Sequence, residues 1–336
     1  MALESRPTAI SSDTIAGKIR AMTFVRTVTE NQIPVVDITA LVRGEAAVDV
    51  GKSLHQASSN LGFIYVKGHG LEAQLLRDLR HVGMEFFRQS AEEKSRVNAT
   101  HSHRGWLGPG QSKMDDSLLP DLKESFVWGY GNQSTESDHP LRGVNLWPSH
   151  PSQLEALAKT YLKQANVVAG HLMRGFALGL GLPENFFLRS ADRPLSRASL
   201  VYYPHQEETN RTQFGVGPHT DFGVLTVLCQ DEIGGLQVQD IHGEWMEAPP
   251  KKNALVINVG DLLSRWTAGA YKSTPHRVLN HSGQERLSIV LAYDPNPETQ
   301  VDPKAIYGSD YSGDLEPISC GDYLQWRFNN AFAYRT

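Results

Sequence analysis

The chain has very few cysteines, with only Cys229 and Cys320 among its 336 residues. Two cysteines are too few for a disulfide framework, and this pair is far from the Cys-x-x-Cys spacing of a metal or redox motif. Because such a composition is typical of a reducing compartment, we expect a cytoplasmic protein.

The sequence also lacks long apolar runs and an excess of basic charge. No stretch approaches the roughly 18 apolar residues that span a bilayer, and residues 1–22 contain no apolar segment of a secretory signal. The 37 acidic residues outnumber the 32 basic ones, so the formal net charge is −5. An acidic chain offers no basic footprint for a phosphate backbone or an anionic membrane. We therefore expect a small-molecule partner, with neither nucleic acid nor membrane, and a monomer is compatible with this interpretation.

The first half of the chain mixes strand and helix patterns. Apolar runs at residues 33–38 and 61–70 predict strands, and apolar residues at helical spacing predict helices over residues 48–59 and 72–89. Residues 98–148 are rich in Gly, Ser, Asp and Pro. We expect that segment to be irregular and to contribute a loop over a site.

The second half begins with a helix and then becomes β-rich. Apolar residues three to four apart predict a helix over residues 153–182, which a Gly-Leu-Pro sequence ends. From Arg197 onward, short β runs separated by turn residues predict a sandwich or barrel rather than a parallel α/β sheet. We expect one functional unit with five successive parts: a leader (1–30), a mixed α/β region (31–150), a long helix with its connection (151–196), a β core (197–300) and a C-terminal segment with a helix (301–336).

His219-Thr220-Asp221 places two metal-competent side chains two residues apart. In an extended segment this spacing puts both on one face, while Thr220 points away. His276 lies 55 residues beyond Asp221 in another β-like run and supplies a third candidate ligand. Two imidazoles and one carboxylate form the facial triad suited to non-haem Fe(II), because open positions remain on the metal. Zinc with a bound water could use the same three ligands, so this triad alone leaves the metal open.

A second motif, Arg286-Leu287-Ser288, follows ten residues after His276. On a strand, Arg286 and Ser288 share a face, so a guanidinium and a hydroxyl can converge on one carboxylate. The neighbouring residues Leu287 and Ile289 to Leu291 are apolar, which favours a protected strand over a solvated edge.

Taken together, these motifs resemble the 2-oxoglutarate and Fe(II)-dependent dioxygenases, in the branch that includes isopenicillin N synthase and the plant flavonoid and gibberellin oxygenases. The segments that carry the resemblance in the second half are GPHTDFGVLTVLCQDEIGGLQV, NALVINVGDLL, YKSTPHRV and ERLSIVLAYDPN. Those in the first half are IPVVDI, GFIYVKGHG, FFRQSAEEK, DLKESFVWG and NLWP. The resemblance implies an α+β fold with a mainly β core, namely a double-stranded β-helix, or jelly roll, with a helical N-terminal region packed around it.

The same resemblance implies the cofactors and the roles of the candidate residues. It implies Fe(II) bound by His219, Asp221 and His276, with 2-oxoglutarate as co-substrate, O₂ as oxidant and ascorbate supporting activity. Arg286 and Ser288 then bind the co-substrate carboxylate. Tyr203 occupies the position of a tyrosine that contacts that carboxylate in the family, although this chain has Val201 where many relatives have asparagine.

The expected function is therefore oxidation, most often hydroxylation, of a small organic molecule with release of succinate and CO₂. Two alternatives remain open from the sequence. One is an oxidase like isopenicillin N synthase, which uses O₂ without 2-oxoglutarate; that enzyme ends with a glutamine that can ligate iron, whereas this chain ends Ala-Tyr-Arg-Thr. The other is a non-catalytic binding module on the same scaffold.

Overall fold

The computed structural model describes residues 25–26, 32–45, 47–111, 120–130, 139–206, 213–280 and 282–332. The leader expected over residues 1–30 lies outside the described residues, apart from the short strand β1. No helix among the described residues is long and apolar enough to cross a bilayer.

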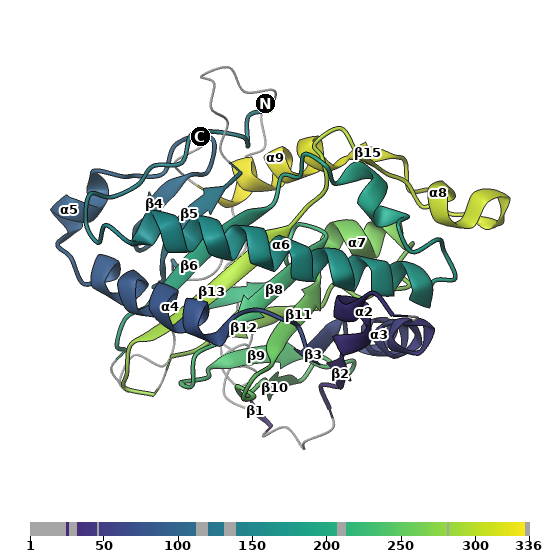
Figure 1. Cartoon of the computed structure of the whole chain (residues 1–336), viewed down its shortest axis with the longest axis horizontal. Helices are drawn as coiled ribbons and strands as arrows, with labels where there is room; N and C mark the ends of the chain where they lie inside the picture. Colours follow the sequence, from purple (N-terminus) through teal and green to yellow (C-terminus); the bar gives the residue numbers. More distant parts are fainter. Residues whose placement is uncertain are drawn as a thin grey trace, which may run out of the picture.

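Two facing sheets form the core of the described structure (Figure 1). The larger sheet has the strand order β2-β3-β11-β8-β13-β6-β5-β4, and the smaller one has the order β1-β10-β9-β12-β7. The larger sheet comprises β2 (Val35–Asp37), β3 (Phe63–Lys67), β4 (Gly105–Leu107), β5 (Glu124–Gly129), β6 (Arg197–Tyr203), β8 (Leu225–Cys229), β11 (Leu255–Val259) and β13 (Arg286–Tyr293). The smaller sheet comprises β1 (Val25–Arg26), β7 (Val216–His219), β9 (Leu236–Gln239), β10 (Trp245–Glu247) and β12 (His276–Val278), and a separate pair is β14 (Gln300–Val301) and β15 (Ile318–Ser319).

Many neighbouring strands in the two sheets come from distant parts of the chain, and most neighbours are antiparallel. Strand β13 pairs with β6 on one side and with β8 on the other. This crossing of the chain between two sheets is the connectivity of a jelly roll. The expected fold is confirmed.

The helices are α2 (Thr39–Arg43), α3 (Val48–Asn60), α4 (Ala73–Phe87), α5 (Ala91–Ser95), α6 (Leu154–Gly179), α7 (Asp261–Trp266), α8 (Lys304–Tyr307) and α9 (Cys320–Ala331), with short 3₁₀ turns at Phe187–Ser190 and Gly308–Asp310. Of these, α3, α4 and α6 pack against strands of the larger sheet. Figure 1 shows α6 lying across this sheet with α4 beside it.

The long helix α6 agrees with the prediction over residues 153–182. Its apolar residues recur every three or four positions, and Leu154, Tyr161, Ala165 and Phe176 are fully buried. A buried apolar stripe of this kind is what holds an amphipathic helix against a sheet. The helix ends at Gly179, shortly before Gly181, whose φ of 72° is left-handed.

The expectation of an irregular segment over residues 98–148 is wrong in two places. Strands β4 and β5 lie within it and extend the larger sheet beyond β6. All six residues of β5 are buried, so the strand lacks the alternation of apolar and polar residues that reveals a half-exposed strand.

A buried ionic cluster ties this added edge to the helical layer. Glu124 accepts hydrogen bonds from Lys94 Nζ at 2.6 Å and from Trp106 Nε1 at 2.7 Å. All three residues are at most 7% exposed. The cluster joins α5, β4 and β5 on the side of β5 that faces the helices.

Removal of the Glu124 carboxylate should therefore destabilise the protein strongly. We expect Glu124→Ala to lower the free energy of unfolding by about 3–5 kcal/mol, because it leaves the Lys94 ammonium buried without its partner. Urea denaturation followed by circular dichroism measures the loss. The control is Glu155→Ala, which breaks the exposed pair with Lys159 and should cost less than about 0.5 kcal/mol. Equal losses in the two variants would contradict this account.

Candidate metal centre

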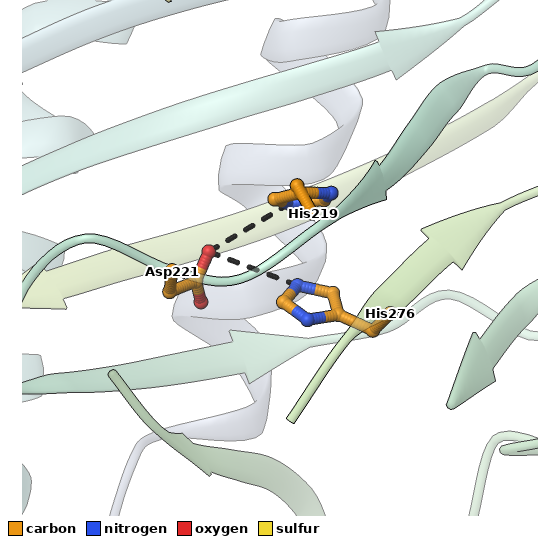
Figure 2. A group of neighbouring side chains, drawn as sticks. All are labelled: His219, Asp221 and His276. Carbon is orange, nitrogen blue, oxygen red and sulfur yellow. Dashed lines mark ion pairs between the residues drawn. The ribbon is translucent and has the colours of Figure 1, made fainter. Parts of the chain in front are cut away.

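His219, Asp221 and His276 converge between the two sheets. His219 ends β7, and His276 begins β12 directly opposite it in the antiparallel register. Asp221 Oδ1 lies 3.8 Å from His219 Nε2 and 3.7 Å from His276 Nε2 (Figure 2). One atom from each residue can be chosen so that all three lie within 4.8 Å of one another. The side chains that the sequence predicts as ligands therefore surround one point.

Each imidazole is oriented by its own backbone neighbourhood. His219 Nδ1 lies 2.8 Å from the carbonyl oxygen of Gly217, and His276 Nδ1 lies 3.2 Å from that of Thr274. When Nδ1–H donates to a carbonyl, the lone pair is on Nε2. Both Nε2 atoms then face the Asp221 carboxylate with an acceptor orbital suited to a metal.

The Asp221 carboxylate is held by the neighbouring sheet through only one of its oxygens. Oδ2 accepts hydrogen bonds from Thr226 Oγ1 and, at 2.7 Å, from Asn258 Nδ2. Thr226 on β8 and Asn258 on β11 are cross-strand partners. With Oδ2 engaged, Oδ1 is the oxygen that points toward the two histidines.

This arrangement revises one expectation from the sequence. Asp221 lies beyond the end of β7, so a turn rather than strand alternation brings it to the side of His219. Gly223 in this turn packs so tightly that an added Cβ would come within 2.3 Å of Asp294 Oδ1. Asn258 and Thr226 contact the candidate ligand directly, and sequence patterns do not reveal these contacts.

The electrostatic surroundings favour the protonation states that a metal needs. Burial, with help from the neighbouring His276, lowers the pKa of His219 to about 3. Burial alone would raise the pKa of Asp221, but His276, His219 and the hydrogen bonds from Asn258 and Thr226 lower it overall. At neutral pH the site therefore offers a neutral imidazole at His219 and an ionised carboxylate at Asp221, both of which are ligand-competent forms.

Arg286 and Ser288 lie on the face of β13 that points toward the space between the sheets. Both are 1% exposed. Arg286 Nε and Nη1 and Ser288 Oγ are buried without a hydrogen-bond partner among the described residues. The nearest carboxylate oxygen is Asp231 Oδ1, 4.0 Å from Arg286 Nε, which is beyond hydrogen-bonding distance. Three buried polar atoms without partners are costly, at about 1–3 kcal/mol each, and their convergence indicates a binding site for an anion.

Tyr203 lies beside this pair. It is the cross-strand partner of Arg286, and the guanidinium carbon lies 4.5 Å from the centre of its ring. Burial raises the pKa of the Tyr203 phenol, while the Arg286 charge opposes that effect. The phenol is thus a neutral hydroxyl at physiological pH.

One cavity of about 220 Å³ connects the two groups of residues. It is lined by all six candidate residues and by apolar side chains from both sheets, such as Leu228 and Val278. Part of the segment over residues 98–148 lines it, as we expect. Two aromatic contributors that sequence patterns do not reveal are Phe328 on α9 and Phe332 directly after it.

Comparisons with known proteins agree with this geometry. The model of the 2OG-Fe(II) oxygenase superfamily matches residues 195–295, and that of the non-haem dioxygenase in morphine synthesis N-terminal region matches residues 33–150. A homoarginine-6-hydroxylase of Glycine max is 33% identical over 307 residues, which cover 85% of this chain and 92% of that protein. A clavatol oxidase of Penicillium crustosum is 30% identical, with 90% and 97% covered.

A solved structure of a protein bound to 2-oxoglutarate is also similar to this chain. A full-length Neurospora crassa protein in complex with α-ketoglutarate (2-oxoglutarate) and thymine has a TM-score of 0.80 and 28% identity, and covers 90% of this chain and 98% of its own. These similarities support an enzyme that uses 2-oxoglutarate, so the alternative of a non-catalytic module is set aside. The chain belongs to the 2-oxoglutarate and Fe(II)-dependent oxygenase superfamily and is an oxidoreductase that depends on Fe(II) and 2-oxoglutarate.

Proposed function

We propose that His219, Asp221 and His276 hold the iron. The proposal is supported by two imidazole nitrogens and one carboxylate oxygen that face one point. Each of these residues is oriented by a hydrogen bond at its other polar atom, which donates in the histidines and accepts in Asp221. Two histidines and one carboxylate leave open positions on Fe(II). Those positions are what a bidentate co-substrate and O₂ require.

We further propose that Arg286, Ser288 and Tyr203 bind the carboxylate of 2-oxoglutarate that lies away from the metal. The observation that carries this proposal is the set of buried polar atoms without partners at Arg286 and Ser288. A carboxylate would accept hydrogen bonds from the guanidinium and the hydroxyl together. The Tyr203 ring stacks against the guanidinium and supports it. The Tyr203 hydroxyl is a further hydrogen-bond donor for the carboxylate.

When bound, iron and 2-oxoglutarate supply the oxidation, in which O₂ is consumed, succinate and CO₂ are released and one oxygen atom passes to the substrate. The residues of this chain bind, orient and exclude water. Thr226 and Asn258 hold Asp221 in place, and Arg286 fixes the orientation of the co-substrate. Apolar side chains such as Leu228 and Val278 line the cavity between the two groups, which limits water near the reaction.

The reaction that we propose is hydroxylation of a small organic molecule. The relatives that support it include a homoarginine hydroxylase and a protein crystallised with thymine, and the modest cavity suits molecules of that size.

We propose that the N-terminal region (31–150), the helix region (151–196), the jelly-roll core (197–300) and the C-terminal segment (301–336) act as one catalytic unit. We also propose a cytoplasmic location and no nucleic-acid or membrane partner, in keeping with the acidic charge and the two free, buried cysteines.

The iron ligands can be tested by loss of turnover. We expect His276→Ala to reduce succinate release to background when purified protein is given Fe(II), 2-oxoglutarate, ascorbate and O₂, because two remaining ligands hold the metal poorly. The control His242→Ala changes an exposed histidine and should keep wild-type succinate release. Full activity in His276→Ala would contradict the proposed triad.

Arg286 can be tested by co-substrate affinity. We expect Arg286→Ala to weaken 2-oxoglutarate binding by about tenfold or more, because charge-assisted hydrogen bonds are worth about 1.5–3 kcal/mol each. Anaerobic calorimetry on Fe(II)-loaded protein measures the dissociation constant. Arg77→Ala, which removes an exposed guanidinium on α4, is the matched control. Unchanged affinity in Arg286→Ala would contradict the proposed role of Arg286 in binding the co-substrate carboxylate.

Asn258 can be tested by metal affinity. We expect Asn258→Ala to weaken Fe(II) binding by about 10- to 100-fold, as is typical when a residue that orients a ligand is removed. The carboxylate of Asp221 would keep only the Thr226 hydrogen bond and could turn away from the histidines. Competition with a coloured chelator measures the metal dissociation constant. A wild-type metal affinity in this variant would show that Asp221 needs no such support.

A further inference from the structure

The cavity continues beyond the proposed iron and 2-oxoglutarate sites, over β5 and β6. Ser125 and Val127 on β5 line this extension, together with their cross-strand partners Val201 and Ser199 on β6. None of these residues is needed for the metal or the co-substrate. The extension is therefore the space available to the primary substrate.

Lys123 places a cation in this extension. Glu124, the next residue, faces the helices, so strand alternation turns Lys123 and Ser125 toward the cavity that both line. The Lys123 side chain is only 14% exposed, and its ammonium forms an ion pair with the buried Asp121 carboxylate, whose Oδ2 lies 3.8 Å away. That distance is beyond hydrogen-bonding range, and Oδ1 of the same carboxylate accepts from the Gly217 amide.

The other cations of the cavity are engaged elsewhere. Arg197 donates to Asp294 Oδ2 at 3.0 Å and to the carbonyl of Leu195, and it stacks over Phe328. Arg286 lies with the proposed co-substrate site. Lys123 is thus the cation in the described cavity wall whose donors remain available to a substrate.

An aromatic wall forms another side of the extension. Phe222, which follows Asp221, packs against Phe328 with ring centres 5.8 Å apart, and Phe328 packs against Phe332 at 5.5 Å. The His103 ring stacks on that of Phe328 and packs at a tilt against that of Phe332, with ring centres 4.6 Å apart in both cases. All four side chains line the cavity. Aromatic side chains of this kind favour ligands that carry a ring, which gain both burial and ring contacts.

We propose that the primary substrate is a small aromatic carboxylic acid whose carboxylate pairs with Lys123 and whose ring packs on Phe222, Phe328 and Phe332. This inference rests on the proposed function, because it assumes that Arg286 and Ser288 are occupied by 2-oxoglutarate. A partly buried ammonium without a hydrogen-bond partner discriminates strongly between a carboxylate and its uncharged analogue. Lys123 is therefore a specificity-determining residue.

The test compares matched acids and amides. Phenylacetate, 3-phenylpropanoate and indole-3-carboxylate, each with its carboxamide, are titrated anaerobically by calorimetry into protein loaded with Fe(II) and 2-oxoglutarate. We expect at least one acid to bind about tenfold or more tightly than its amide. In Lys123→Gln that preference should fall to about twofold or less, while the amide keeps its affinity. Lys123→Arg should preserve the preference, and Lys67→Gln, which changes an exposed lysine on β3, should not alter it.

The outcomes separate this inference from the function on which it rests. If wild-type protein takes up 2-oxoglutarate but no acid binds more tightly than its amide, the substrate class is wrong and the proposed function stands. An acid preference that survives in Lys123→Gln equally overturns the role of Lys123. If the wild-type protein shows no heat of 2-oxoglutarate binding, the result contradicts the proposed co-substrate site, on which the inference about the substrate rests.

Discussion

Two hydrogen bonds join the Asp221 carboxylate to the larger sheet, and the proposed iron site depends on them. Asp221 lies in the connection from β7 to β8, where the chain crosses from the smaller sheet to the larger one. The two histidines belong to the smaller sheet, whereas Thr226 and Asn258 belong to the larger. By fixing one carboxylate oxygen to the larger sheet, these bonds direct the other toward the histidines. The proposed metal centre therefore contains residues held by both sheets, and its geometry depends on how the sheets are packed.

The site also shows where the fold gives up stability for function. Jelly-roll interiors are filled by apolar side chains, yet β13 directs Arg286 and Ser288 inward with donors that no described residue satisfies. Buried groups of this kind destabilise a protein unless a ligand completes their hydrogen bonds. The flanking Leu287, Ile289 and Leu291 on the other face of β13 are at most 1% exposed, and their packing beneath the helices offsets part of this cost.

One face of the larger sheet forms one wall of the whole cavity. Along β13 the alternating residues Arg286, Ser288, Val290 and Ala292 line it, from the co-substrate end toward the far end. Strands β6 and β5, which follow β13 in the sheet, continue the same wall along the extension that we assign to the substrate. Because the sheet is a rigid, hydrogen-bonded surface, the co-substrate, the metal and the substrate can be held in fixed relative positions.

The local spacing of residues determined much of this site. His219-x-Asp221 and Arg286-x-Ser288 are recognisable because each pair is close in sequence, and His276 completes a chemically distinctive ligand set. Helix α6 and most strands of the core can also be recognised within a short stretch of sequence, because the period of the apolar residues indicates which face is buried. What the tertiary structure alone decided are contacts between distant segments. Asn258 reaches Asp221 across 37 positions, Lys123 meets the cavity because β5 joins β6, and α9 brings Phe328 to the cavity wall. Strand pairing and helix docking create these contacts, and no spacing within a short stretch of sequence records them.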